Sequence, residues 1–136
     1  MQHRRIVSFG LLCSMLPTSA WAETIDTSGT LICALSDVQV CAPGGPCALQ
    51  TVESLDAPYF LMVSVAAKKI TGTRPSGSPV DAKIELVHRS QESLFLQGTQ
   101  EAFDWTLAIA EGSGKMTLTL ADSDHGAVAF GACIAR

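Results

Sequence analysis

Residues 103–121 read FDWTLAIAEGSGKMTLTLA, a stretch in which apolar and polar side chains alternate on either side of a short polar turn. Glu111-Gly112-Ser113-Gly114 supplies the turn, and these residue types favour tight turns. A period of two is typical of strands with one buried face, so the stretch predicts a β-hairpin. The side chains expected to face the core are Trp105, Leu107, Ile109, Met116, Leu118 and Leu120.

The same pattern extends from this hairpin toward both ends of the chain, with turn residues between the alternating segments. Thr71–Pro79 holds two prolines and two glycines and is expected to be a loop. Helix signals are almost absent. The predicted fold class is therefore all-β, an antiparallel meander of about eight strands. The expected strands lie at 30–40, 59–65, 69–73, 82–89, 93–99, 103–110, 115–121 and 127–134.

The N-terminal residues have the features of an export signal. Arg4 and Arg5 precede a short apolar run, and Ala20-Trp21-Ala22 offers the small residues that a signal peptidase needs. The predicted division is a signal peptide at 1–22, cleaved between Ala22 and Glu23, and a single β domain at 23–136. The apolar run is too short to span a bilayer, which takes about 20 residues, and no longer run follows it. The expected location is periplasmic or secreted.

Four of the five cysteines follow the signal peptide, and an even number in a small exported domain predicts two disulfides. Three connectivities are possible. Cys41 and Cys47 flank a Pro/Gly loop, so a local bridge between them is geometrically easy. Cys33 and Cys133 then remain, on the first and last expected strands. A bond between them makes these strands neighbours, which favours a closed small barrel over a two-sheet sandwich.

The mature chain is acidic. Removal of Arg4 and Arg5 leaves seven basic side chains against thirteen acidic ones, a net charge of −6. Such a surface repels phosphate backbones, and Lys68-Lys69 is only a pair, so nucleic acid is a poor candidate partner.

Several short segments carry a resemblance. They are Leu96-Gln97-Gly98, Trp105-Thr106-Leu107, Gly114-Lys115-Met116-Thr117 and Phe130-Gly131-Ala132-Cys133. Together they give an LQG…W…GKMT…FGAC pattern that resembles a group of small uncharacterised exported proteins of proteobacteria. The resemblance implies a Gram-negative periplasm. It implies no activity and no catalytic residues.

Few residues suggest chemistry. His88 shares the apolar face of its strand with Ile84 and Leu86, which predicts a core or barrel-mouth histidine more than a base or ligand. The turn Asp122-x-Asp124-His125-Gly126 resembles the opening of a calcium loop, but the later oxygen ligands of such loops are missing. We expect a surface turn there, without metal or cofactor, that contacts a partner together with the Thr71–Pro79 loop.

No Ser/His/Asp, Cys/His or paired-carboxylate signature of an enzyme is found in the sequence. The sequence therefore favours a non-catalytic β-barrel binding module, whose partner is an unknown protein or a small apolar ligand. One alternative is an inhibitor of an envelope or secreted enzyme, such as a lysozyme or a protease. A small hydrolase is the second alternative. Small residues on the last strand, such as Ala127 and Ala129, could leave a cavity or could receive Trp105; the sequence does not decide between these outcomes.

Overall fold

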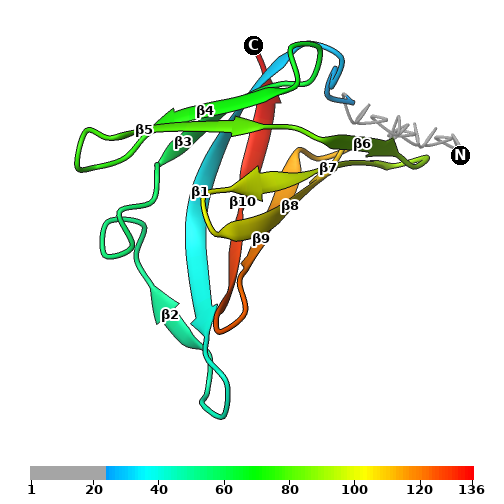
Figure 1. Cartoon of the computed structure of the whole chain (residues 1–136). Coiled ribbons are helices and arrows are strands. Elements are labelled where there is room, and N and C mark those ends of the chain that lie inside the picture. The colour runs from blue at the N-terminus through cyan, green and yellow to red at the C-terminus, as the bar shows by residue number, and fades with distance from the viewer. Residues whose placement is uncertain (1–23) are drawn as a thin grey trace, which may run out of the picture.

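The computed structural model describes residues 24–136, so the expected signal peptide and its cleavage site lie outside the described residues. Every regular element in this part of the chain is a strand (Figure 1). The strands are β1 (Thr30–Cys41), β2 (Ala48–Gln50), β3 (Phe60–Ser64), β4 (Lys69–Thr73), β5 (Pro79–Lys83), β6 (Leu86–Arg89), β7 (Ser93–Gln100), β8 (Phe103–Ala110), β9 (Lys115–Ala121) and β10 (Gly126–Ala135).

The strands form one antiparallel sheet in the order β5-β4-β3-β1-β10-β9-β8-β7-β6, with β2 paired to the end of β1. Only Ile84 and Glu85 separate β5 from β6. The two edge strands are therefore one bent segment that pairs with β4 at one end and with β7 at the other. The sheet curls into a barrel-like meander. Its main path has eight strands when this segment is counted once and the short strand β2, which lies off the path, is left out. The prediction of an all-β, barrel-like meander is confirmed.

The two disulfides have the predicted partners. Cys33 and Cys133 lie directly opposite each other in the β1–β10 ladder, and a bond joins them. A second bond joins Cys41 to Cys47 and closes the loop between β1 and β2. The first bridge therefore ties the first long strand to the last, 100 residues apart in sequence.

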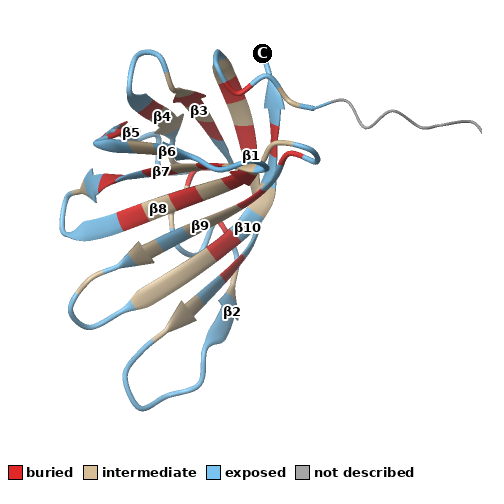
Figure 2. Ribbon diagram, turned by 90° about the vertical axis from the view of Figure 1, so that its right-hand side faces the viewer, coloured by how far each residue is buried: buried red, intermediate tan, exposed pale blue. Residues whose placement is uncertain are grey.

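The core consists of the inward-facing side chains of the strands (Figure 2). Trp105, Leu107 and Ile109 of β8 are all buried, as the alternation in 103–121 predicts. On β7, Leu94 and Leu96 are fully buried between outward-facing neighbours. Figure 2 shows this alternation as red bands separated by tan and blue residues along the strands.

The predicted single apolar face of Ala82–Arg89 is wrong beyond Ile84. Ile84 is fully buried, but Leu86 and His88 are exposed, and Val87 packs against the core instead. His88 therefore lies on the outside of the barrel, where its ring is 6.1 Å from that of Phe95, centroid to centroid. It is neither a core nor a barrel-mouth residue.

The reason is the change of partner between β5 and β6. The Ile84 amide donates to the Lys68 carbonyl at 2.9 Å, whereas the Glu85 amide donates to the Gln97 carbonyl at 2.8 Å. The strand leaves one neighbour for another at this point, and the inward positions shift by one residue. A shift of one residue exchanges the two faces of a strand.

The predicted loop Thr71–Pro79 is shorter in the structure. Strand β4 continues through Thr73 and β5 begins at Pro79, so the turn covers only residues 74–78. The Arg74 amide donates to the Ser78 carbonyl at 2.9 Å, and the Gly77 amide donates to the Arg74 carbonyl at 2.8 Å. Ladder hydrogen bonds with β3 and β5 hold the first part of the expected loop in the sheet.

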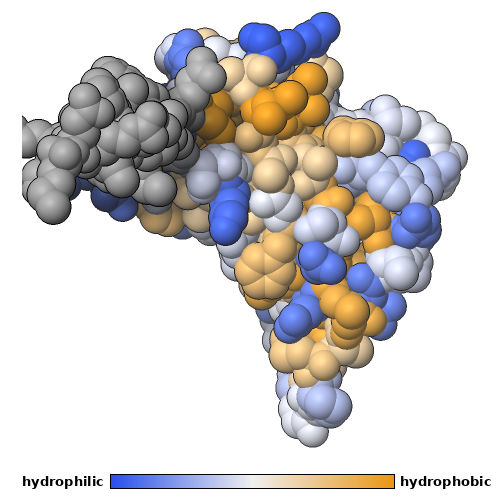
Figure 3. Space-filling model, turned by 180° about the vertical axis from the view of Figure 1, so that it is seen from behind, coloured by the Kyte–Doolittle hydropathy of each residue, from blue (hydrophilic) through white to orange (hydrophobic). Residues whose placement is uncertain are grey.

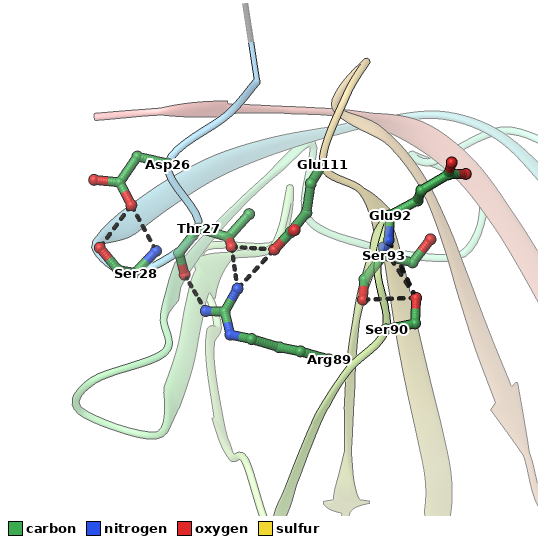
Figure 4. Close-up of polar contacts among 8 residues, drawn as sticks. All are labelled: Asp26, Thr27, Ser28, Arg89, Ser90, Glu92, Ser93 and Glu111. Atoms are coloured by element: carbon green, nitrogen blue, oxygen red, sulfur yellow. Dashed lines mark hydrogen bonds and ion pairs between the residues drawn. The ribbon is translucent and has the colours of Figure 1, made fainter.

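One end of the barrel is fastened by the segment that precedes β1 (Figure 4). The Arg89 guanidinium donates to Glu111 Oε1 at 2.6 Å, to the Thr27 carbonyl at 3.0 Å and to the Thr27 hydroxyl. That hydroxyl in turn donates to Glu111 Oε1 at 2.5 Å. Thr27 is buried, so these bonds satisfy polar groups that water does not reach. We call this the Arg89 end.

Candidate functional site

A cavity of about 390 Å³ opens at the other end of the barrel. Its inner wall is almost entirely aliphatic or aromatic. The volume lies in the range of small-molecule sites, about 300–1,000 Å³, which are typically apolar with a few polar groups. The wall residues include Leu35, Val38, Val40, Leu61, Ile70, Val80, Ala82, Phe103, Trp105, Leu118, Leu120, Ala127 and Ala129, and Gln100 is a polar, uncharged lining residue.

The cavity exists because small side chains face large ones across the barrel. Ala127 and Ala129 of β10 line it, and Ala82 of β5 lines it from another side. The largest wall residue, Trp105, is accommodated by Gly98, its direct partner in the β7–β8 ladder. A Cβ atom at Gly98 would lie 2.7 Å from Trp105 Cζ2, closer than packing permits. The indole ring therefore occupies the space over Gly98, and the space beside the β10 alanines stays open.

Trp105 carries the one buried polar side-chain atom that lacks a hydrogen-bond partner in residues 24–136. Its Nε1 atom has no acceptor, and the residue is 5% exposed. An unpaired buried donor of this kind costs about 1–3 kcal/mol. Such groups are rare in folded proteins and are worth explaining, and this one belongs to a cavity wall.

Four connecting segments form the mouth of the cavity. Leu55 comes from the β2–β3 connection, Arg74 from the β4–β5 turn, Glu101 from the β7–β8 turn and His125 from the β9–β10 turn. Arg74 Nη2 lies 3.8 Å from Glu101 Oε1, so a loose ion pair spans two of these turns. The charged groups of the cavity are therefore confined to its mouth.

The β2–β3 connection contributes lining residues to the cavity and is held by two side-chain contacts. Asp56 accepts hydrogen bonds from the Ser76 amide (2.8 Å) and hydroxyl (2.7 Å). These bonds hold the pKa of Asp56 below its usual range. The Tyr59 hydroxyl donates to Glu53 at 2.5 Å, which lowers the pKa of Glu53 and raises that of Tyr59. Both contacts are at the surface.

The residues of the predicted contact turn have separate roles. The Asp122 carboxylate accepts the amide hydrogens of Asp124 (2.7 Å) and His125 (2.6 Å), and these bonds lower its pKa. Asp124 is exposed and accepts a hydrogen bond from Ser123. His125 and Gly126 line the cavity, whereas the two carboxylates do not. No group of three metal-ligating side chains occurs among the described residues.

Sequence reasoning missed the mouth as a unit. Arg74 lay inside a loop expected to contact a partner, but nothing marked it as special. Glu101 sits in the two-residue β7–β8 turn with φ of 55°, a left-handed conformation that non-glycine residues rarely adopt. No local sequence signal brings Arg74 and Glu101 together, since 27 positions separate them and only the curl of the sheet makes them neighbours.

No helix that could cross a membrane occurs in residues 24–136. No protein-family model, curated protein or solved structure matches the chain. What the protein does must therefore be inferred from the geometry and chemistry of the cavity.

Proposed function

We propose that the protein is an exported binding module that takes up a small apolar molecule in the barrel cavity. The observation that carries the proposal is an open cavity of about 390 Å³ whose wall is almost entirely apolar. Transfer of apolar ligand surface from water into such a site is favourable, at about 25 cal/mol per Å². The wall offers packing surface and no array of reactive groups, which favours binding without turnover.

The two disulfides support an extracytoplasmic place of action. Disulfide bonds persist in oxidising compartments and are rare in the cytosol. Together with the export signal expected at 1–22, they favour the periplasm or the medium as the place where the ligand is met.

The test is a titration with the fluorescent apolar probe N-phenylnaphthylamine. We expect its emission to rise with saturation on the wild-type protein. Ala127→Leu fills the cavity from β10 and should weaken binding on the order of tenfold or more. Ala132→Leu is the matched control, since Ala132 lies on the same strand but is exposed. Failure of the probe to bind the wild type, or equal binding by both variants, would refute the proposal.

One observation favours a second candidate function, inhibition of an envelope or secreted enzyme. The loop 42–47 is exposed throughout, is closed by the Cys41–Cys47 bond and extends beyond the body of the barrel (Figure 1). A loop fixed in advance loses less entropy on insertion into a cleft. An assay against lysozyme and a panel of proteases tests this candidate: inhibition should be lost when Cys41 and Cys47 are both replaced by alanine.

A further inference from the structure

We infer that the ligand is an amphiphile with an anionic carboxylate head, and that Arg74 at the cavity mouth binds this head. The inference rests on the proposed function, since it names the chemical class that the same cavity selects. Three observations support it: the position of Arg74 at the cavity mouth, its largely unused N–H donors and the engagement or exposure of the neighbouring acidic side chains.

Arg74 is placed to meet a ligand head. Its backbone is fixed by the two hydrogen bonds of the 74–78 turn, and its side chain lines the cavity with only 27% of its surface exposed. The aliphatic part of an arginine side chain packs well against apolar surface, while its guanidinium stays charged at any relevant pH. A ligand whose apolar chain fills the cavity would place its head beside this group.

The donors of Arg74 are largely unused in residues 24–136. Its one ion pair there is with Glu101 at 3.8 Å, which is longer than the 2.7–2.9 Å typical of a charge-assisted hydrogen bond. Arg89 at the opposite end makes a useful comparison. The Arg89 guanidinium bonds to both Thr27 and Glu111, and its ion pair with Glu111 is 2.6 Å long, much shorter than the ion pair of Arg74. Arg89 holds the fold together, whereas Arg74 keeps donors available for a planar acceptor such as a carboxylate.

The neighbouring acids do not block this role. The Glu101 side chain is 69% exposed on a two-residue turn, so it can turn outward when another carboxylate approaches. The Asp56 carboxylate is engaged by Ser76. His125 also lines the mouth, with more than half of its side chain exposed. When a ligand carboxylate binds, Arg74 would exchange its loose ion pair with the exposed Glu101 for a close ion pair with the ligand. This new ion pair would lie at a site that is partly shielded from water.

Figure 3 shows the molecule from behind, where hydrophobic and polar side chains alternate over the surface and hydrophobic groups gather in several places. Phe60 and Ile134 are exposed apolar side chains that do not line the cavity. An apolar chain could adsorb to them without Arg74, so the test must distinguish cavity binding from surface binding.

The experiment measures binding of decanoate, decanol and decylamine by the fluorescence of Trp105, the only tryptophan in residues 24–136 and a wall residue of the cavity. We expect wild-type protein to bind decanoate on the order of tenfold more tightly than decanol, and decylamine most weakly. Arg74→Met keeps an apolar stem and should abolish the preference for decanoate while decanol still binds. Arg74→Lys keeps the positive charge and should retain part of the preference for decanoate. Lys115→Met removes a cation at the start of β9, at the opposite end of the β9–β10 ladder from the mouth, and should leave all three affinities unchanged.

The outcomes separate the two proposals. Binding of decanol and decanoate with equal affinity, or a decanoate preference that survives in Arg74→Met, would overturn the role of Arg74 and leave the binding module intact. Tightest binding of decylamine would overturn the anionic class and point to Glu101. No fluorescence change with any of the three ligands, together with no uptake of N-phenylnaphthylamine, would overturn both. Melting temperatures of all variants should stay near the wild-type value, because Arg74 holds no close internal partner.

Discussion

Removal of each disulfide in turn should destabilise the protein to very different degrees. The change is Cys33→Ala with Cys133→Ala in one variant, and Cys41→Ala with Cys47→Ala in the other. A crosslink stabilises mainly by restricting the unfolded chain, and the effect grows with the loop that it closes. The sequence separations are 100 and 6 residues.

The chain-entropy relation converts these separations into free energies. It gives about 4.7 kcal/mol for the bond between β1 and β10 and about 2.2 kcal/mol for the local bond. The difference of about 2.5 kcal/mol corresponds to roughly 8–15 °C in melting temperature for a domain of this size. Burial of Cys33 and Cys133 adds a packing loss of the same sign.

Urea denaturation separates the two contributions. Loss of the long crosslink lets the denatured chain expand, so the m-value of the first variant should rise, whereas that of the second should stay near the wild-type value. A packing loss alone would lower the midpoint without changing the m-value. Equal destabilisation of both variants, or a larger loss for the Cys41/Cys47 pair, would refute the reasoning.

Three further predictions concern single positions. Gly98→Ala puts a methyl group 2.4 Å from the Lys83 carbonyl oxygen and 2.7 Å from Trp105 Cζ2, so it should lower the free energy of unfolding by about 1–3 kcal/mol and shift the Trp105 emission. Gly112→Ala has open space around the new methyl group and should do neither. Identical behaviour of the two variants would contradict the packing around Gly98. Trp105→Phe removes the unpaired N–H, so the loss of unfolding free energy, measured by chemical denaturation, should be well under the ~3–5 kcal/mol typical of truncating a core tryptophan to alanine. A loss as large as that of Trp105→Ala would count against an unpaired donor. Hydrogen bonds from Ser76 lower the pKa of Asp56 in the folded protein, which contributes stability that is present above its unfolded pKa near 4 and is lost as pH falls through the lowered folded value. The melting temperature of Asp56→Asn should therefore fall less steeply than that of wild type between about pH 5 and about pH 2. Parallel curves would show that the Ser76 contact is not linked to stability.

Local patterns in the sequence predicted the strands well where each strand keeps one pair of neighbours. In 103–121 the alternation places Trp105, Leu107 and Ile109 inward, and the structure buries all three. The prediction failed at His88, because the strand changes neighbours at Ile84 and Glu85. Alternation reports the side on which a residue lies only while the ladder is continuous.

The mouth of the cavity was beyond the reach of any local pattern. Arg74, Glu101 and His125 come from three different turns that the curl of the sheet brings to one end of the barrel. Within each turn, the residue types are those of ordinary surface turns. A turn was expected at Asp122–Gly126, and the structure places the β9–β10 turn at residues 122–125. The Asp122 carboxylate binds the backbone of its own turn, and the Asp124 carboxylate accepts from Ser123, so of this segment only His125 and Gly126 line the cavity. Contact of the turn with a partner stays a prediction.

The sequence by itself determined the fold class and the crosslinks. Period-two alternation is a property of neighbouring residues, and the cysteine spacing left one easy local pair and one long-range pair. Only the tertiary structure decided that the barrel holds an open cavity. That outcome depends on the volumes of side chains that meet across the barrel, with the β10 alanines facing larger neighbours and Trp105 accommodated by Gly98. Packing between strands that are distant in sequence depends on the tertiary structure. No single segment of the sequence contains both a side chain and the neighbours that surround it in the core, so no local pattern shows whether a cavity remains.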